Sequence, residues 1–278
     1  MGPSAIRIAG LGPRLEELGH AVVDYGNIPM SDMSTAVMGD VRARYLGNVL
    51  AECALLAEKV SDCLRHRCLP LVLGGDQSVS IGTSAGLAGT GGARGIIWVD
   101  AHADFNTTKT TPSGNIHGMA LAAILGYGHP KLANLGGVSP KALEKNTVLI
   151  AGRSFDPAEA KALAGSKVTV YTMRDIDELG MKKVMRDSVR IATSGVQELH
   201  LSFDVDALDP MEAPGTGTPV EGGLTYREAH LAMEMLHDSG KVTSAELVEV
   251  NPILDRANHT AELAVELMLS LFGKRITA

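Results

Sequence analysis

The chain has 278 residues, 45% of them hydrophobic, which is enough to bury a sizeable core. Its formal net charge is -7, and its Lys and Arg residues form no block, which argues against a nucleic-acid or anionic-membrane partner. No apolar run reaches the roughly 20 residues of a membrane span, and the chain opens without the charged-then-apolar order of a signal peptide. We therefore expect a cytoplasmic protein that acts on a small molecule and has no membrane contact.

The cysteines form an odd set within one short stretch: Cys53, Cys63 and Cys68. This usage is typical of reduced thiols rather than of a disulfide framework. We expect them to fill the core as small hydrophobic residues, with a metal-binding pair as the alternative. The sequence contains no internal repeat, low-complexity tract or linker, so we expect a single domain over residues 1–278.

Short apolar runs that are rich in branched residues predict buried strands. They cover residues 69–73, 95–99, 147–151, 199–203 and 244–250. Their hydrophobicity is nearly continuous rather than alternating, as expected for strands that are covered on both faces. This pattern predicts a parallel sheet.

Helical patterns lie between and after these runs. Residues 42–66 predict one helix and residues 260–272 predict the last one. Another helix is predicted to begin at Thr225, which has capping-box spacing to Glu228. Segments rich in Gly, Ser and Thr predict loops at residues 81–94 and 107–115. Strands that alternate with helices predict a doubly wound, three-layer α/β fold.

Two strand ends carry metal-ligand residue types at regular spacing. The first is Asp100-Ala-His102-Ala-Asp104, whose alternate side chains share one face of extended chain, roughly 6 to 7 Å apart. The second strand ends with Asp204 and Asp206. Four carboxylates gathered at the carboxyl edge of a parallel sheet would repel one another, and a divalent cation or a pair of them would neutralise the charge.

An oxygen-rich ligand set with one imidazole favours manganese over a thiolate-bound zinc site. The alternative is structural, because an Asp that follows a strand commonly caps a turn or a helix. Capping explains neither the imidazole of His102 nor the repeated alternation of ligand types. The sequence therefore favours a metal site.

The motifs resemble those of the arginase or ureohydrolase family, in order and at matching spacing over nearly the whole chain. They are residues 74–78 (GGDQS, against GGDHS in the family), 100–104 (DAHAD), 106–118 (ending in SGNIHG), 202–228 (SFDVD to GLTYRE) and 248–252 (VEVNP). The resemblance implies an arginase-like α-β-α sandwich around a mostly parallel, eight-stranded sheet.

The resemblance also implies two Mn²⁺ ions. It makes Asp100 and Asp204 bridging ligands, Asp104 a ligand of the first site, and His102 and Asp206 ligands of the second site. The remaining first-site ligand in the family is the histidine of GGDHS, and Gln77 occupies that position here. A neutral amide oxygen offers a transition metal less than an imidazole does. We therefore predict a weakened first site in which Gln77 is a weak or absent ligand.

Three catalytic roles follow from the same resemblance. His117 matches the proton shuttle or general acid, a role that suits an imidazole because it titrates near neutral pH. Glu249 matches the carboxylate that pairs with the substrate guanidinium. Asp104 matches the residue that holds the tetrahedral intermediate formed by attack of metal-bridging hydroxide.

Further matches concern the amino-acid end of the substrate. Asn106, Ser113 and Asn115 match positions that hold the α-carboxylate in arginases. Asp156 matches the residue that binds the α-amino group, with Glu159 behind it, and Thr218 lines the same pocket. Ser154 stands where arginases usually have another Asp, so this contact set is one charge short.

The implied reaction is hydrolysis of L-arginine to L-ornithine and urea. Two alternatives stay open: a related enzyme such as an agmatinase, guanidinobutyrase or formimidoylglutamase, or a metal-deficient pseudoenzyme caused by Gln77. The resemblance also implies a homo-oligomer, either a trimer or a hexamer.

Overall fold

The computed structural model describes residues 1–32, 34–89 and 93–276. Its centre is one sheet in the order β1-β6-β5-β2-β3-β4, in which every neighbouring pair is parallel. The strands are β1 (Leu71–Leu73), β2 (Arg94–Val99), β3 (Thr147–Gly152), β4 (Thr169–Thr172), β5 (Glu198–Asp204) and β6 (Val242–Val248). The predicted parallel α/β fold is confirmed.

The predicted count of eight strands is wrong for the described residues, which form six. That count came from the resemblance and not from an apolar run in this sequence. Before β1, the described chain forms helices α1 to α3 and irregular segments instead of strands.

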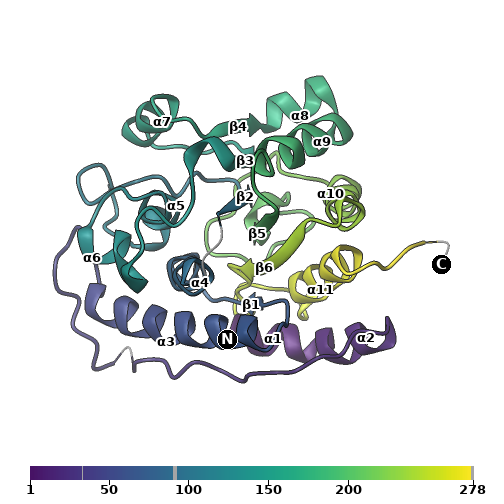
Figure 1. Cartoon of the computed structure of the whole chain (residues 1–278), viewed down its shortest axis with the longest axis horizontal. Helices are drawn as coiled ribbons and strands as arrows, with labels where there is room; N and C mark the ends of the chain where they lie inside the picture. Colours follow the sequence, from purple (N-terminus) through teal and green to yellow (C-terminus); the bar gives the residue numbers. More distant parts are fainter. Residues whose placement is uncertain (33, 90–92, 277–278) are drawn as a thin grey trace.

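Helices cover both faces of the sheet, as Figure 1 shows with the strands running through the middle of the molecule. One layer consists of α3 (Leu46–Arg65), α4 (Val79–Ala88), α5 (Ala120–Ile124), α6 (Pro130–Ala133) and α7 (Pro157–Ala164). The other consists of α1 (Gly2–Ile8), α2 (Leu11–Glu17), α8 (Met173–Leu179), α9 (Met181–Ala192), α10 (Tyr226–Ser239) and α11 (His259–Leu271). Short 3-10 turns are η1 (His117–Met119), η2 (Leu135–Gly137), η3 (Glu144–Asn146) and η4 (Val205–Ala207).

The two faces of the sheet bury separate apolar clusters. On β2, Ile96 and Trp98 face the α4 and α5 layer, whereas Ile97 and Val99 face the α9 to α11 layer. This division follows from the alternation of side chains along a strand. Because both faces are covered, the central strands consist of nearly continuous apolar residues.

Helix α10 confirms the predicted capping box. The Thr225 hydroxyl accepts a hydrogen bond from the Glu228 backbone N–H, and the Glu228 carboxylate accepts one from the Thr225 backbone N–H. Gly240 ends the helix in the left-handed conformation, at φ 60°, where a glycine is free of strain. The predicted helices at residues 42–66 and 260–272 correspond to α3 and α11.

The loop predicted at residues 81–94 is largely wrong, although residues 90–92 lie outside the described part. Residues 79–88 form α4. The other predicted loop is correct, because residues 107–115 contain neither helix nor strand. The glycines that suggested a loop allow α4 to approach α3 closely. A Cβ atom on Gly82 would lie 2.7 Å from the Cys53 carbonyl oxygen, and one on Gly86 would lie 2.6 Å from that of Ala57.

Gly86→Ala is therefore expected to lower the free energy of unfolding by about 1–3 kcal/mol, because the added methyl group overpacks the α3–α4 contact. Elsewhere in a helix, Gly to Ala usually stabilises. Denaturant unfolding would measure the effect. Gly89→Ala is the matched control, since its Cβ would meet its nearest neighbour at 3.6 Å. A Gly86→Ala protein as stable as the parent would contradict this account of α4.

The cysteines are all free thiols; Cys53 and Cys63 are buried, and Cys68 is exposed. The prediction that cysteines fill the core therefore holds for two of the three. Within the described residues, no helix combines the length and apolar composition that crossing a bilayer requires.

Candidate metal centre and active site

The candidate site lies where the chain direction across the sheet reverses. From β2 the chain continues to β3 on one side, and from β5 it continues to β6 on the other, while β2 and β5 are hydrogen-bonded neighbours. Ligand sites of open α/β sheets lie at such a switch point, beyond the carboxyl ends of the strands. Val99 pairs with Phe203, so the residues that follow them, Asp100 and Asp204, leave adjacent strands at the same level.

Three of the predicted ligands converge tightly. Each of Asp100, His102 and Asp206 offers a ligand atom within 4.8 Å of the others, and no other His, Cys, Asp or Glu trio in the described chain does so. His102 Nδ1 lies 3.0 Å from Asp206 Oδ2 and 3.5 Å from Asp100 Oδ1. Asp104 and Asp204, the other predicted carboxylate ligands, lie outside this trio but are buried beside it.

Several carboxyl groups are buried together at this site, and both their burial and their mutual repulsion disfavour the ionised forms. Burial and the neighbouring Asp206 raise the pKa of Asp100 to about 7. Burial and nearby carboxylates raise the pKa values of Asp104 and Asp204 well above their ordinary value. Burial lowers the pKa of His102, but the carboxylates of Asp100 and Asp206 outweigh the effect of burial and raise the pKa to about 11. The donor set therefore fits a divalent cation, which would replace protons as the neutralising charge.

Proton release on metal binding would test this interpretation of the raised pKa values. Since the pKa of His102 is raised to about 11 and that of Asp100 to about 7, Mn²⁺ must displace protons from these two groups near pH 7, and its affinity should rise with pH. Calorimetric titrations in two buffers with different protonation enthalpies would measure the release. His102→Asn should release fewer protons per ion than the parent chain. Equal heats in both buffers for the parent would contradict the prediction.

Gln77 follows β1 in the loop that leads into α4 and is only 1% exposed. Its Nε2 donates to Ser80 Oγ at 2.6 Å and to Ser202 Oγ at 2.9 Å. Its Oε1 has no hydrogen-bond partner, and the same is true of the buried Asp104 Oδ2. Buried oxygens without a hydrogen-bond partner are costly, and a bound cation would satisfy such an atom.

Glu249 links three of the sequence motifs at the end of β6. Its Oε1 accepts a hydrogen bond from the Gln77 backbone N–H at 2.9 Å and lies 3.4 Å from His117 Nδ1. Its Oε2 faces Gly217, where an added Cβ would lie 3.9 Å away. Glu249 has a φ of 64°, a left-handed conformation that strains this residue type, and Asp104 has a φ of 49°. Such strain is typical of functional positions.

The structure brings some of the predicted substrate-binding residues into contact with one another or with the predicted metal ligands. Asn106 Nδ2 donates to Asp156 Oδ2 at 2.9 Å, so these two side chains are in contact. Thr218 Oγ1 donates to Asp206 Oδ2 at 3.0 Å, next to the metal ligands. Ser113 and Asn115 are exposed and contact each other, with Ser113 Oγ accepting from the Asn115 backbone N–H.

The Glu159 side chain connects two loops of the predicted substrate-binding region. Its carboxylate accepts hydrogen bonds from the backbone N–H groups of Phe105 and Asp156, which makes it the N3 partner in the capping box of α7. Glu159 thus ties the loop after β2 to the loop after β3.

Ser154, which stands where arginases usually have another Asp, is half-buried, and its backbone N–H donates to the Ala101 carbonyl oxygen.

Arg153 has a structural role that the sequence interpretation missed. Its guanidinium donates to a set of backbone carbonyl oxygens: those of Ala151, Asp206, Ala207, Leu208, Val220 and Glu221. Five donors in a rigid fork suit this arrangement, and Lys could not reproduce it. The only signal in the sequence is the position of this Arg directly after an apolar strand, which does not reveal its partners.

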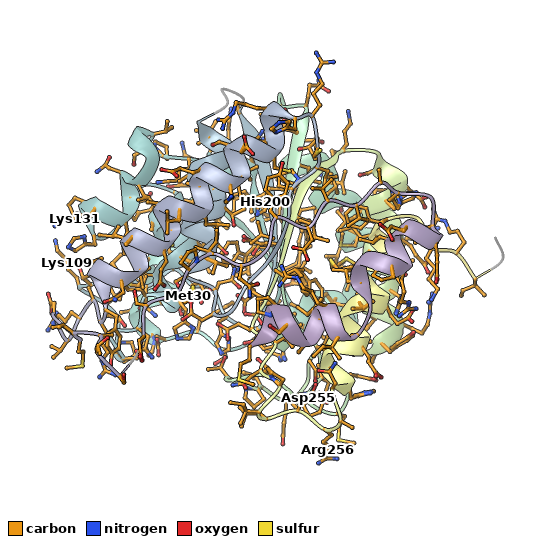
Figure 2. The ribbon with its side chains drawn as sticks, turned by 90° about the horizontal axis from the view of Figure 1, so that it is seen from below. Met30, Lys109, Lys131, His200, Asp255 and Arg256 are labelled. Carbon is orange, nitrogen blue, oxygen red and sulfur yellow. The ribbon has the colours of Figure 1, made fainter. Side chains whose placement is uncertain are left out.

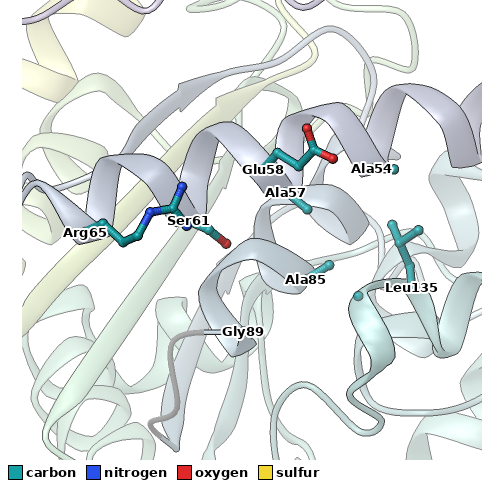
Figure 3. A pocket seen from close by; sticks show the side chains of 9 residues that line it. Ala54, Ala57, Glu58, Ser61, Arg65, Ala85, Gly89 and Leu135 are labelled. Atoms are coloured by element: carbon teal, nitrogen blue, oxygen red, sulfur yellow. The ribbon is translucent and has the colours of Figure 1, made fainter.

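A separate groove of about 520 Å³ lies between α3, α4 and η2 (Figure 3). Ala54, Ala57, Glu58, Ser61 and Arg65 line it from α3. Among the described residues, its lining includes none of the predicted metal or substrate ligands. The site is therefore defined by the carboxylates at the sheet edge and not by this groove.

The fold and the site define a class of protein: parallel α/β proteins that gather carboxylate and imidazole ligands at the switch point of the sheet. A model of the arginase family matches residues 1–273. An arginase from Bacillus subtilis (strain 168) is 51% identical over 276 residues, which are 99% of this chain and 92% of that protein. The chain belongs to the arginase family.

Solved structures agree with this assignment. The native structure of an arginase from Bacillus caldovelox matches with a TM-score of 0.97 at 50% identity, covering 99% of this chain and 93% of that one. The structure of Entamoeba histolytica arginase in complex with L-ornithine matches with a TM-score of 0.89 at 30% identity, covering 98% and 92%.

Proposed function

We propose that this chain hydrolyses the guanidino group of L-arginine to give L-ornithine and urea. The observation that carries the proposal is the convergence of Asp100, His102 and Asp206 at the switch point, beside buried Asp104 and Asp204. Relatives at about 50% identity are named arginases, and the E. histolytica relative was solved with L-ornithine. We propose that residues 1–278 form one catalytic domain.

The residues fit two divalent cations, and manganese is our choice because the donors are hard oxygens with one imidazole. Asp100 and Asp204 would bridge the ions, Asp104 would hold the first, and His102 and Asp206 would hold the second. When bound, the two ions supply Lewis acidity and lower the pKa of a shared water.

The protein's own groups bind the substrate and move its protons. The Glu249 carboxylate would pair with the guanidinium through charge-assisted hydrogen bonds. Because His117 lies 3.4 Å from Glu249, its ring is placed to protonate the amine that leaves. Asp104 would accept a hydrogen bond from the reacting carbon's amino substituent. These groups orient the trigonal carbon and complete bond cleavage.

The amino-acid end of the substrate would lie over the loops after β2 and β3. Asp156, held by Asn106, would accept from the α-amino group, and Asn106, Ser113 and Asn115 would donate to the α-carboxylate, with Thr218 lining the pocket. Agmatine lacks that carboxylate, so these donors favour arginine. Ser154 contributes no charge to this end.

Urea release from a substrate panel at saturating Mn²⁺ tests the proposal. L-arginine should give the highest kcat/KM, above agmatine, guanidinobutyrate and guanidinopropionate. A higher kcat/KM for any of these three compounds would identify that compound, instead of arginine, as the preferred substrate. No urea from any substrate, together with fewer than two bound ions, would indicate the metal-deficient pseudoenzyme instead. A cytoplasmic location, a part in arginine metabolism and a trimeric or hexameric assembly stay predictions.

A further inference from the structure

Thr110 lies in the loop after β2, which also carries Asn106, Ser113 and Asn115 of the proposed substrate site. Its exposed neighbour Lys109 lies at the edge of the molecule (Figure 2). Thr110 is half-buried, and its hydroxyl contacts Asn106, which is proposed to bind the amino-acid end of the substrate. This contact determines how the Asn106 side chain is presented to a ligand.

The hydrogen bonds of the Thr110 hydroxyl define where its hydrogen points. Its oxygen accepts a hydrogen bond from the Thr107 backbone N–H at 2.8 Å, which uses a lone pair. The single hydrogen is free to be donated, and the nearest acceptor is Asn106 Oδ1 at 2.9 Å. The carbonyl and hydroxyl oxygens of Thr107 are each 3.4 Å away, too far to compete well. The Thr110 hydroxyl therefore donates to Asn106 Oδ1.

The Asn106 side chain is thus held at both ends of its amide, and the residue is only 6% exposed. Its Oδ1 accepts from Thr110, and its Nδ2 donates to Asp156 Oδ2 at 2.9 Å. A flipped amide would place Oδ1 against the Asp156 carboxylate, where two acceptors would face each other. The flip would also remove the acceptor of the Thr110 hydrogen. Both neighbours therefore favour the same orientation.

This orientation decides what the amide can offer to a bound amino acid. The amide nitrogen has two hydrogens, and within the described chain only one of them is donated, to Asp156. The second is available to a carboxylate, with which it would form a charge-assisted hydrogen bond. Asp156 keeps further lone pairs for an ammonium group. The fixed Asn106 amide therefore presents a donor for an α-carboxylate beside an acceptor for an α-amino group.

We propose that Thr110 is a positioning residue, which fixes the Asn106 amide in the orientation that recognises the α-carboxylate of the substrate. The inference rests on the proposed function, in which Asn106 and Asp156 bind the amino-acid end of L-arginine. Because this end lies away from the guanidino carbon that reacts, Thr110 should contribute to substrate affinity and not to the rate of bond cleavage.

Steady-state kinetics of L-arginine hydrolysis by the Mn²⁺-loaded full chain test the proposal. Thr110→Val keeps the branched shape of the side chain and removes the hydroxyl. It should raise the KM for L-arginine by about 3–10-fold at unchanged kcat, which is the loss expected for one hydrogen bond. Thr110→Ser retains the hydroxyl and should restore the parent KM. Damage to the site as a whole would lower kcat as well.

A matched control lies in the same loop. The hydrogen bond that Thr108 accepts from Arg42 uses the backbone carbonyl oxygen, which valine retains, so Thr108→Val should keep the parent KM. A double variant isolates the path through the amide: Thr110→Val added to Asn106→Ala should raise the KM no further, because both changes act through one side chain.

Thermal unfolding verifies that each variant is folded. An unchanged KM in folded Thr110→Val would overturn the inference. So would a Thr110→Ser variant that fails to restore the KM, or a further rise of the KM in the Asn106→Ala background.

Calorimetric titration with L-ornithine separates this inference from the proposed reaction, because it measures recognition of the amino-acid end without turnover. Thr110→Val should bind L-ornithine about 3–10-fold more weakly than the parent chain does. This loss, together with no urea from any guanidino substrate, would support the role of Thr110 and reject the proposed reaction. Urea release with equal KM values in the parent and in Thr110→Val would reject the role of Thr110 while the reaction stands. A parent chain that binds neither L-arginine nor L-ornithine would overturn both.

Discussion

Asp100→Asn is expected to lower manganese affinity and urea release by more than about 100-fold, because even the loss of an outer-shell partner costs up to that factor. Asp100 belongs to the tight trio with His102 and Asp206, and it is proposed to bridge both ions. It also accepts hydrogen bonds from Trp98 Nε1 at 2.9 Å and from the His102 backbone N–H at 2.7 Å. Asparagine would retain at most part of these contacts and none of the charge.

Elemental analysis after dialysis and a urea assay would measure the two effects together. Asp187→Asn is a suitable control, since it removes a carboxylate on α9 that pairs with Lys183. Asp100→Asn protein that retains two ions and half of the parent activity would remove Asp100 from the centre.

His117→Ala is expected to lower kcat by about 10²–10⁴-fold, the usual contribution of a positioned general acid or base. Manganese content should not change, because His117 is not among the proposed ligands. This separation distinguishes proton transfer from metal loss. A His117→Ala variant that keeps full kcat, or that loses manganese, would contradict the proposed role.

The protonation of His117 adds a pH test of the same role. The hydrogen bond to Glu249 raises the pKa of His117 and outweighs burial, so the ring stays protonated to a higher pH than an ordinary histidine. Stability from this pair is therefore fully present below the ordinary pKa, roughly pH 6.5, and is lost as the pH rises through the raised value. In Glu249→Gln, NMR titration of the ring should show a lower pKa. An unchanged value would mean that Glu249 does not hold the proton.

The sequence predicted those parts of the fold that depend on local pattern. The five apolar runs became β1, β2, β3, β5 and β6, and the Thr225–Glu228 box begins α10. The missed strand, β4, lies at the sheet edge with all four residues half-buried, so it lacks a continuous apolar run. Helix α4 was missed because its Gly82 and Gly86 are weak helix formers that tertiary packing against α3 overrides.

The site was predictable to a similar extent. The alternation in residues 100–104 placed Asp100 and His102 together, and the strand end at residue 204 supplied Asp206. The contacts of Gln77 were not predictable, because Ser202 is 125 residues away and Ser80 is one of many serines. Glu159 likewise depends on a capping contact that joins two loops.

The Arg153 clamp bears on how the centre is assembled. Its guanidinium stays charged over the whole working pH range and ties the chain around Asp206 to the loop at residues 220–221 through carbonyl oxygens. These contacts are made by protein groups alone, so we expect the chain around Asp206 to keep its shape without the ions and to lose little chain entropy when they bind. A chelator should therefore extract manganese reversibly and without unfolding the protein.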